Sequence, residues 1–189
     1  MTLLQILTDI CSRVGDVYLD RYKARAQDHF LRALVSMIKE GNYTDNDIKG
    51  YVKLKTDLTF TTNPLDISAL KLLKIDGIMP NPQVPNNFTV YFKDFNDFTL
   101  MSQVDELQPL ATEVFIYQVG INLYAVYKAT GSNFVPATKP LYMKYIEDID
   151  PTTWVDASIM TGTPFWMTRS FIRSGINIAT ATLLEEVNT

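Results

Sequence analysis

The spacing of apolar residues changes twice along the chain, and this change constrains the fold more than any single motif. In the first fifty residues, apolar side chains recur every three or four positions, whereas between about 51 and 150 they often alternate with polar ones. The first period is typical of helices and the second of half-buried strands. The final segment returns to helical spacing. We therefore expect an α+β fold with an N-terminal helical hairpin, a central, mostly antiparallel β region and a C-terminal helical segment.

Capping signals predict the helices of the first fifty residues. Thr2 and Gln5 match a capping box, and Gly15 can end the first helix in a left-handed conformation. A longer helix is expected over residues 16–40, with an i,i+4 pair of Asp28 and Arg32 on its exposed face. A short third helix is expected from Thr44.

Alternation and turn residues predict the β region. The clearest feature is a hairpin of 114–118 and 122–127 that turns at Gly120. Further strands are expected over 52–60, 88–92, 98–101 and 141–146. Residues 1–50, 51–150 and 151–189 are thus expected as a helical part, a β region and a C-terminal docking segment, although the helical parts and the β region can also form one domain.

The tail is expected to be a helix capped by Thr163, with Pro164 in the first helical position. Residues 176–182 are rich in β-branched side chains, so a strand there is the alternative. One face of the expected helix is apolar and carries Phe171, Ile172, Gly175, Ile176, Ala179 and Leu183.

Few side chains are suited to catalysis or metal binding. The chain has two Trp, ten Tyr and ten Phe residues but a single histidine, His29, and a single cysteine, Cys11. Cys11 is expected to be a buried structural thiol. No Gly-rich phosphate loop or nucleophile elbow occurs. We expect a protein that is not an enzyme and holds no cofactor or metal.

Two groups of acidic residues are candidate sites. The segment 45–50 begins like a calcium loop, but Lys49 and Thr56 stand where ligand oxygens are needed. Helix capping by Thr44 and Asp47 is the interpretation we prefer. A carboxylate-dependent hydrolase is a less favoured hypothesis, and its candidate residues are Asp94, Asp97, Glu147, Asp148 and Asp150.

The tail also concentrates large aromatic side chains beside arginines. Trp, Phe, Met and Arg are enriched at protein interfaces, so the tail is a candidate docking region, with packing on its own domain as the alternative. The predicted partner-binding residues are Trp154, Phe165, Trp166, Met167, Arg169, Phe171 and Arg173. A second hypothesis is a small peptide- or carbohydrate-binding module that uses Tyr91, Tyr117, Tyr124 and Tyr127.

These parts together resemble a known family. The opening segment 3–15, the long helix with Arg21, Arg25, Phe30 and Leu34, and the closing segment 163–187 resemble the head-to-tail adaptor, or connector-ring, proteins of tailed bacteriophages, particularly short-tailed and crAss-like phages.

The resemblance implies a structural virion protein. Such a protein forms a homo-oligomeric ring, of twelve subunits, between portal and tail around the DNA channel. Its implied partners are the portal protein and further tail or ring proteins, and its implied location is the head–tail connector of a virion assembled in the host cytoplasm. A formal net charge of −4 is compatible with a channel through which DNA passes without being specifically bound. No membrane segment is expected.

Overall fold

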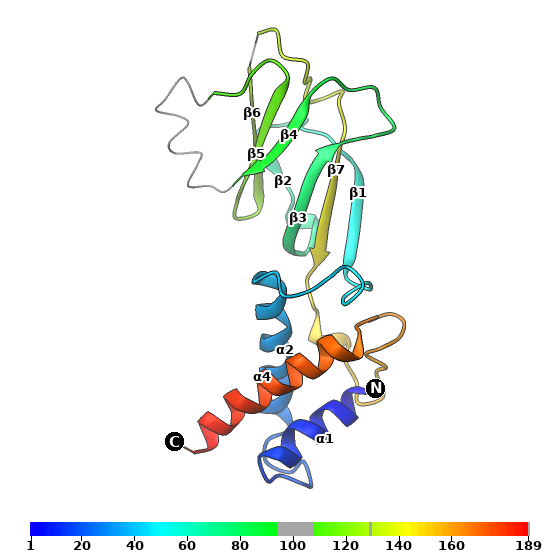
Figure 1. Ribbon diagram of the computed structural model, residues 1–189, viewed down its shortest axis with the longest axis vertical. Helices are drawn as coiled ribbons and strands as arrows, with labels where there is room; N and C mark the ends of the chain where they lie inside the picture. Colours follow the sequence, from blue (N-terminus) through cyan, green and yellow to red (C-terminus); the bar gives the residue numbers. More distant parts are fainter. Residues whose placement is uncertain (94–107, 129, 189) are drawn as a thin grey trace. The chain divides into compact units, whose positions relative to one another are not determined.

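The fold is α+β, with helices toward both ends of the chain and sheets between them (Figure 1). The computed structural model describes residues 1–93, 108–128 and 130–188. The chain divides into two compact units, of which one combines residues 1–52 with 148–189 and the other comprises residues 53–147. The two ends of the chain therefore build one helical unit, and the β unit is an insertion in its sequence.

The helical unit is organised around the packing of its longest helices. It contains α1 (Leu3–Arg13), α2 (Lys23–Lys39), the 3₁₀ turn η3 (Pro151–Thr153) and α4 (Arg169–Val187). Helix α4 contacts both α2 and α1. A Cβ atom at Gly175 of α4 would lie 2.9 Å from Leu34 Cδ2 and 3.0 Å from Phe30 Cε2 of α2. The absence of a side chain at Gly175 is therefore what permits this close approach.

Helix α1 begins and packs as its sequence predicts. Thr2 Oγ1 accepts from the Gln5 amide at 3.2 Å, and Gln5 Oε1 accepts from the Thr2 amide at 2.9 Å, which completes the capping box. Cys11 is buried on the inner face of α1, as predicted. Burial, and then the nearby Asp16 carboxylate, raises the pKa of its thiol.

The expectation of one helix over 16–40 was wrong at its start, because α2 begins only at Lys23. The Asp16 carboxylate accepts hydrogen bonds from the backbone amides of Asp20, Arg21 and Tyr22, at 3.2, 3.0 and 2.8 Å. Burial raises the pKa of Asp16, but these three bonds outweigh burial and leave the pKa below its usual value. An acidic side chain thus folds residues 16–22 into a loop instead of a helical turn.

Two further helix boundaries differ from expectation. The segment after Thr44 forms a run of turns without a helix, although Thr44 and Asp47 do bond to each other at 2.9 Å, from the Thr44 amide to Asp47 Oδ2. Helix α4 is capped by Thr168 and not by Thr163, since Thr168 Oγ1 accepts from the Phe171 amide at 3.3 Å. The alternative of a strand over 176–182 was wrong, because these residues lie inside α4.

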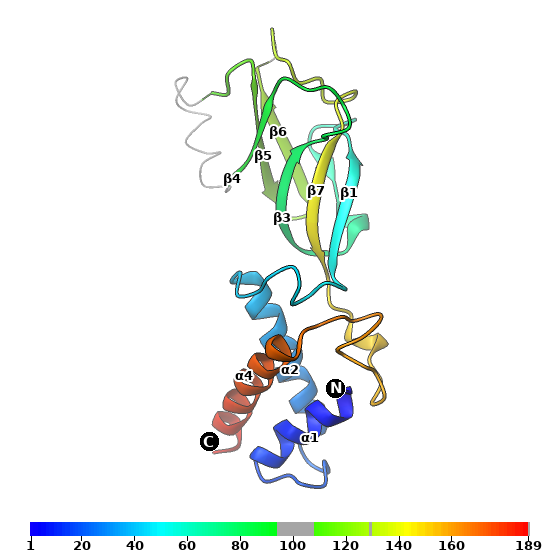
Figure 2. The ribbon, with the colours of Figure 1, turned by 45° about the vertical axis from the view of Figure 1, so that its right-hand side comes forward.

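The β unit is a pair of sheets with an apolar core between them (Figure 2). The strand orders are β1-β7-β3 and β2-β6-β5-β4. The pairs β3–β7, β5–β6 and β2–β6 are antiparallel, whereas β4–β5 is parallel. The strands are β1 (Val52–Leu58), β2 (Leu65–Asp66), β3 (Leu72–Pro80), β4 (Thr89–Lys93), β5 (Glu113–Val119), β6 (Asn122–Tyr127) and β7 (Leu141–Glu147).

The hairpin prediction is confirmed, and Gly120 has the positive φ of 58° that its turn requires. Strands β1, β4 and β7 were also expected, within two residues at either end. Strands β2 and β3 were missed, because proline residues and Gly77 interrupt the alternation there. The strand expected over 98–101 lies outside the described residues.

The contact at Gly175 can be tested by adding a side chain. We expect Gly175→Leu to destabilise the helical unit by about 1–3 kcal/mol, because a larger side chain must displace Phe30 and Leu34 in a packed interface. Ser174→Leu, at the exposed neighbouring position of α4, is the matched control and should change stability little. Urea unfolding followed by circular dichroism measures both variants, and equal stabilities would refute the proposed close packing.

Candidate functional site

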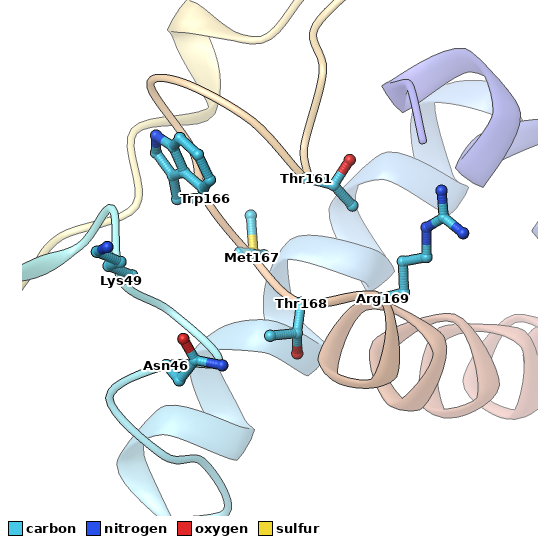
Figure 3. Close-up of a pocket in the computed structure, with 7 residues that line it drawn as sticks. All are labelled: Asn46, Lys49, Thr161, Trp166, Met167, Thr168 and Arg169. Atoms are coloured by element: carbon cyan, nitrogen blue, oxygen red, sulfur yellow. The ribbon is translucent and has the colours of Figure 1, made fainter.

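The candidate site is an open hollow on the helical unit, beside the first turn of α4. Its volume is about 350 Å³, near the lower end of the roughly 300–1,000 Å³ typical of ligand sites. Figure 3 shows Trp166 and Lys49 on one side of the hollow and Thr161 and Arg169 on the other. The full lining comprises Asn46, Lys49, Thr161, Trp166, Met167, Thr168 and Arg169.

Hydrogen bonds join the two distant segments that line this hollow. Thr168 Oγ1 donates to Asp47 Oδ1 at 2.6 Å, and the Thr168 amide donates to the Asp47 carbonyl at 2.9 Å. Nearby, a Cβ atom at Gly50 would lie 2.4 Å from the carbonyl oxygen of Phe165, so only glycine allows the two backbones to approach this closely. The turn after α2 is thereby fixed against the segment that leads into α4.

Trp166 is the prominent side chain of the site. Its side chain is half-exposed, with a relative accessibility of 48%, and its φ of 40° is unusual for a bulky residue. The indole Nε1 donates to Thr163 Oγ1 at 2.8 Å, and the Trp166 amide donates to the Gly162 carbonyl at 2.8 Å. Holding such a residue in this conformation costs about 1–3 kcal/mol, and strain of this kind often occurs at binding sites.

Two cations line the hollow, one beside the indole ring and one at the opposite side. Lys49 Nζ lies 5.9 Å from the centre of the Trp166 ring, within cation–π range. Arg169 is exposed at the opposite side. Among the described residues, neither cation forms a salt bridge. The hollow can therefore accept an aromatic or apolar side chain together with a nearby carboxylate.

The structure separates the seven predicted partner-binding residues into two groups. Trp154, Phe165, Met167 and Phe171 are buried within the helical unit, where the Trp154 ring centre lies 6.2 Å from that of Phe30 and 6.4 Å from that of Phe165. These four side chains are core residues of this chain. The exposed residues are Trp166, Arg169 and Arg173, and the first two of them line the hollow.

Sequence reasoning missed the other half of the site. Asn46 and Lys49 belong to the turn that was interpreted as a failed calcium loop and a helix cap. Thr161 and Thr168 carry no interface signal by composition. The sequence offered one hint, since Gly50 follows Lys49 and marks a close backbone approach.

The four tyrosines of the second hypothesis do not share one exposed surface. Tyr117 is fully buried, Tyr124 and Tyr127 are half-buried, and only Tyr91 is exposed, at 42%. Tyr127 belongs to the side of the sheet that faces the main core, where its ring centre lies 5.5 Å from that of Phe134. Tyr117 and Tyr124 lie in a separate small cluster with Phe115.

Two of the acidic candidates, Glu147 and Asp150, form polar contacts in the described structure. Glu147 forms an ion pair of 3.4 Å with Lys53, and Asp150 Oδ1 accepts from the Thr152 amide at 2.9 Å at the start of η3. Asp94 and Asp97 lie outside the described residues. Asp148, the remaining candidate, directly precedes the connection to η3.

His29 is buried and has a carboxylate partner. Its Nε2 lies 3.1 Å from Glu186 Oε2, and this bond is the main reason that the pKa of Glu186 is lowered. The expected Asp28–Arg32 pair is present, at 2.8 Å. Within residues 1–93, 108–128 and 130–188, no three His, Cys, Asp or Glu side chains are grouped to hold a metal ion.

The helices in the described part of the chain are also all too short or too polar to cross a bilayer.

The Asp47 link can be tested through its pH dependence. The hydrogen bond from Thr168 is the largest effect on the pKa of Asp47, and it lowers that pKa. Burial raises the pKa and the bonds from Thr44 lower it, so that the pKa lies below its ordinary value of 3.8. The resulting stabilisation is complete above the unfolded pKa and disappears as pH falls through the folded pKa. We expect Asp47→Asn to lower stability by about 1 kcal/mol at pH 7, with the difference from wild type shrinking below pH 4.

Unfolding by urea at pH 7 and pH 3 measures this effect. Asp45→Asn, an exposed carboxylate in the same turn, is the control. A deficit in Asp47→Asn that is equally large at both pH values would contradict the assigned role of the carboxylate.

Comparison with known proteins identifies no family for this chain, since no family model matches it and no curated protein matches its sequence.

Proposed function

We propose that this chain is a structural assembly protein that forms a homo-oligomeric ring, and that the Trp166 hollow is one of its protein-docking sites. The observation that carries the proposal is the half-exposed, conformationally strained Trp166 in a hollow that the cations Lys49 and Arg169 also line. Tryptophan and arginine dominate the binding energy of protein interfaces. The resemblance to connector-ring proteins supplies the setting, a ring between portal and tail of a tailed phage.

The rigidity of the hollow supports this role. Trp166 is held by two hydrogen bonds, and its neighbours Phe165 and Met167 are buried. A side chain that is already ordered loses little entropy when it binds, so it contributes more to affinity than a mobile one. The buried tail residues thus serve docking indirectly, by fixing the one aromatic residue that is exposed.

The β unit offers a second kind of contact surface. Strand β1 lies at the edge of its sheet, and Leu54 on it is exposed. An edge strand can pair with a strand of another chain, while charged residues such as Lys53 and Lys55 limit indiscriminate pairing. Docking through both surfaces suits a ring subunit that has neighbours on two sides.

Removal of the indole tests the proposal. We expect Trp166→Ala to weaken assembly by about 30-fold or more, measured as the midpoint concentration of self-association or as affinity for the portal protein. The monomer should stay folded, because the indole ring is half-exposed. Alanine at this position relieves only part of the strain of the left-handed backbone. Sedimentation velocity measures self-association, and a pull-down measures portal binding.

Two variants serve as comparisons. Tyr91→Ala removes a similarly exposed aromatic ring from the β unit and should leave assembly unchanged, whereas Phe165→Ala should unfold the helical unit. A wild-type chain that stays monomeric at every concentration and does not bind the portal would contradict the proposed function.

A further inference from the structure

A second exposed feature of the helical unit lies at the C-terminal end of α4, whereas the Trp166 hollow lies at its N-terminal end. The loop between α1 and α2 carries Val17 and Tyr18 with relative accessibilities of 65% and 84%. We call residues 17–19 the tip. The hollow beside this loop is lined by residues 14–18, residues 20–22 and Val187, so the tip adjoins the C-terminal end of α4. The Trp166 hollow adjoins the N-terminal end.

The tip is rigid despite its exposure. Three backbone amides after it donate to the buried Asp16 carboxylate, and the Asp16 amide donates to the Cys11 carbonyl at 2.9 Å. Leu19 has a positive φ of 59°, and Val17 and Tyr18, which precede it, are exposed. An exposed apolar pair on an ordered loop is therefore available for binding with little entropy loss.

The tip and the hollow are complementary in charge and chemistry. Asp16, Asp20 and Arg21 flank the tip and give its surroundings a net charge of −1, whereas the residues that line the hollow include the cations Lys49 and Arg169 and no acidic side chain. The tip offers an aromatic ring, and the hollow offers an indole ring with Lys49 beside it and Arg169 on the opposite side of the hollow. A tyrosine ring that packs on a tryptophan ring and beside an arginine side chain makes favourable aromatic and cation–π contacts.

The positions of the two features determine the symmetry of such a contact. Helix α4 has 19 residues, so its ends are roughly 27 Å apart and the tip cannot reach the hollow of its own chain. A contact between different surfaces of identical chains is heterologous, and it closes into a ring when the rotation per subunit permits.

We infer that the tip of one subunit, centred on Tyr18, docks into the Trp166 hollow of the next copy of this chain. This inference deepens the proposed function, because it rests on ring formation and names the self-contact that would produce it.

Disulfide trapping tests the contact. The only native cysteine, Cys11, is buried, so engineered pairs can be read without interference. In the Val17→Cys/Asn46→Cys double variant, which keeps Tyr18, the new thiols are too far apart to bond within one chain, since a disulfide needs Cβ atoms about 4 Å apart. We expect mild oxidation to give a ladder of dimers, trimers and larger covalent species. Each single variant should give nothing beyond dimers.

Mixing two half-defective chains provides a second test. Tyr18→Ser lacks the tip and Trp166→Ala lacks the hollow, so each alone should be monomeric. A mixture of the two should form heterodimers that grow no further, because one intact contact remains per pair. Native mass spectrometry resolves these species, and Ile178→Ala, at an exposed position in the middle of α4, is the control that should assemble normally.

The outcomes distinguish this inference from the proposal on which it rests. If the wild type forms a ring while the double variant gives no ladder and Tyr18→Ser still assembles, the tip is not the occupant, although the ring proposal stands. If Trp166→Ala loses only portal binding, the hollow binds the portal and the inference is wrong. A wild type that never self-associates would overturn both.

Discussion

The close packing of α2 against α4 at Gly175 is the contact on which the rest of the structure depends. These helices lie more than one hundred residues apart in sequence, and their contact makes one unit from the two ends of the chain. Helix α4 in turn places the tip loop at one end and the Trp166 hollow at the other. A side chain at Gly175 would separate the helices and disturb both features.

The helical unit uses its aromatic residues for two purposes. Trp154, Phe165 and Phe171 are buried and order the segment that leads into α4, whereas Trp166 is exposed by its left-handed backbone. Hydrogen bonds to Thr163 and to the Gly162 carbonyl hold Trp166 in its strained conformation, and its exposed ring is the basis of the docking role that we propose.

Local interactions were predictable from sequence, and interactions between distant segments were not. The capping box of Thr2, the apolar face of α4 and the hairpin at Gly120 depend on neighbouring residues. The start of α2 was not predictable, because it depends on whether the Asp16 side chain bonds to the backbone or points into solvent. Composition suggested that the tail binds a partner, yet it could not separate Phe171 in the core from Trp166 on the surface. Lys49 joins the site only through a fold contact across more than one hundred residues.

Tryptophan fluorescence tests most directly the proposal that identical subunits assemble and cover Trp166. The chain has two tryptophans, and Trp154 is already buried at 6% accessibility, so quenching by acrylamide reports mainly on Trp166. As protein concentration rises through the range of self-association, the account predicts that quenching falls and emission shifts to shorter wavelength. Assembly measured in the same samples by light scattering, without any change in quenching, would show that Trp166 stays exposed and would contradict the central claim.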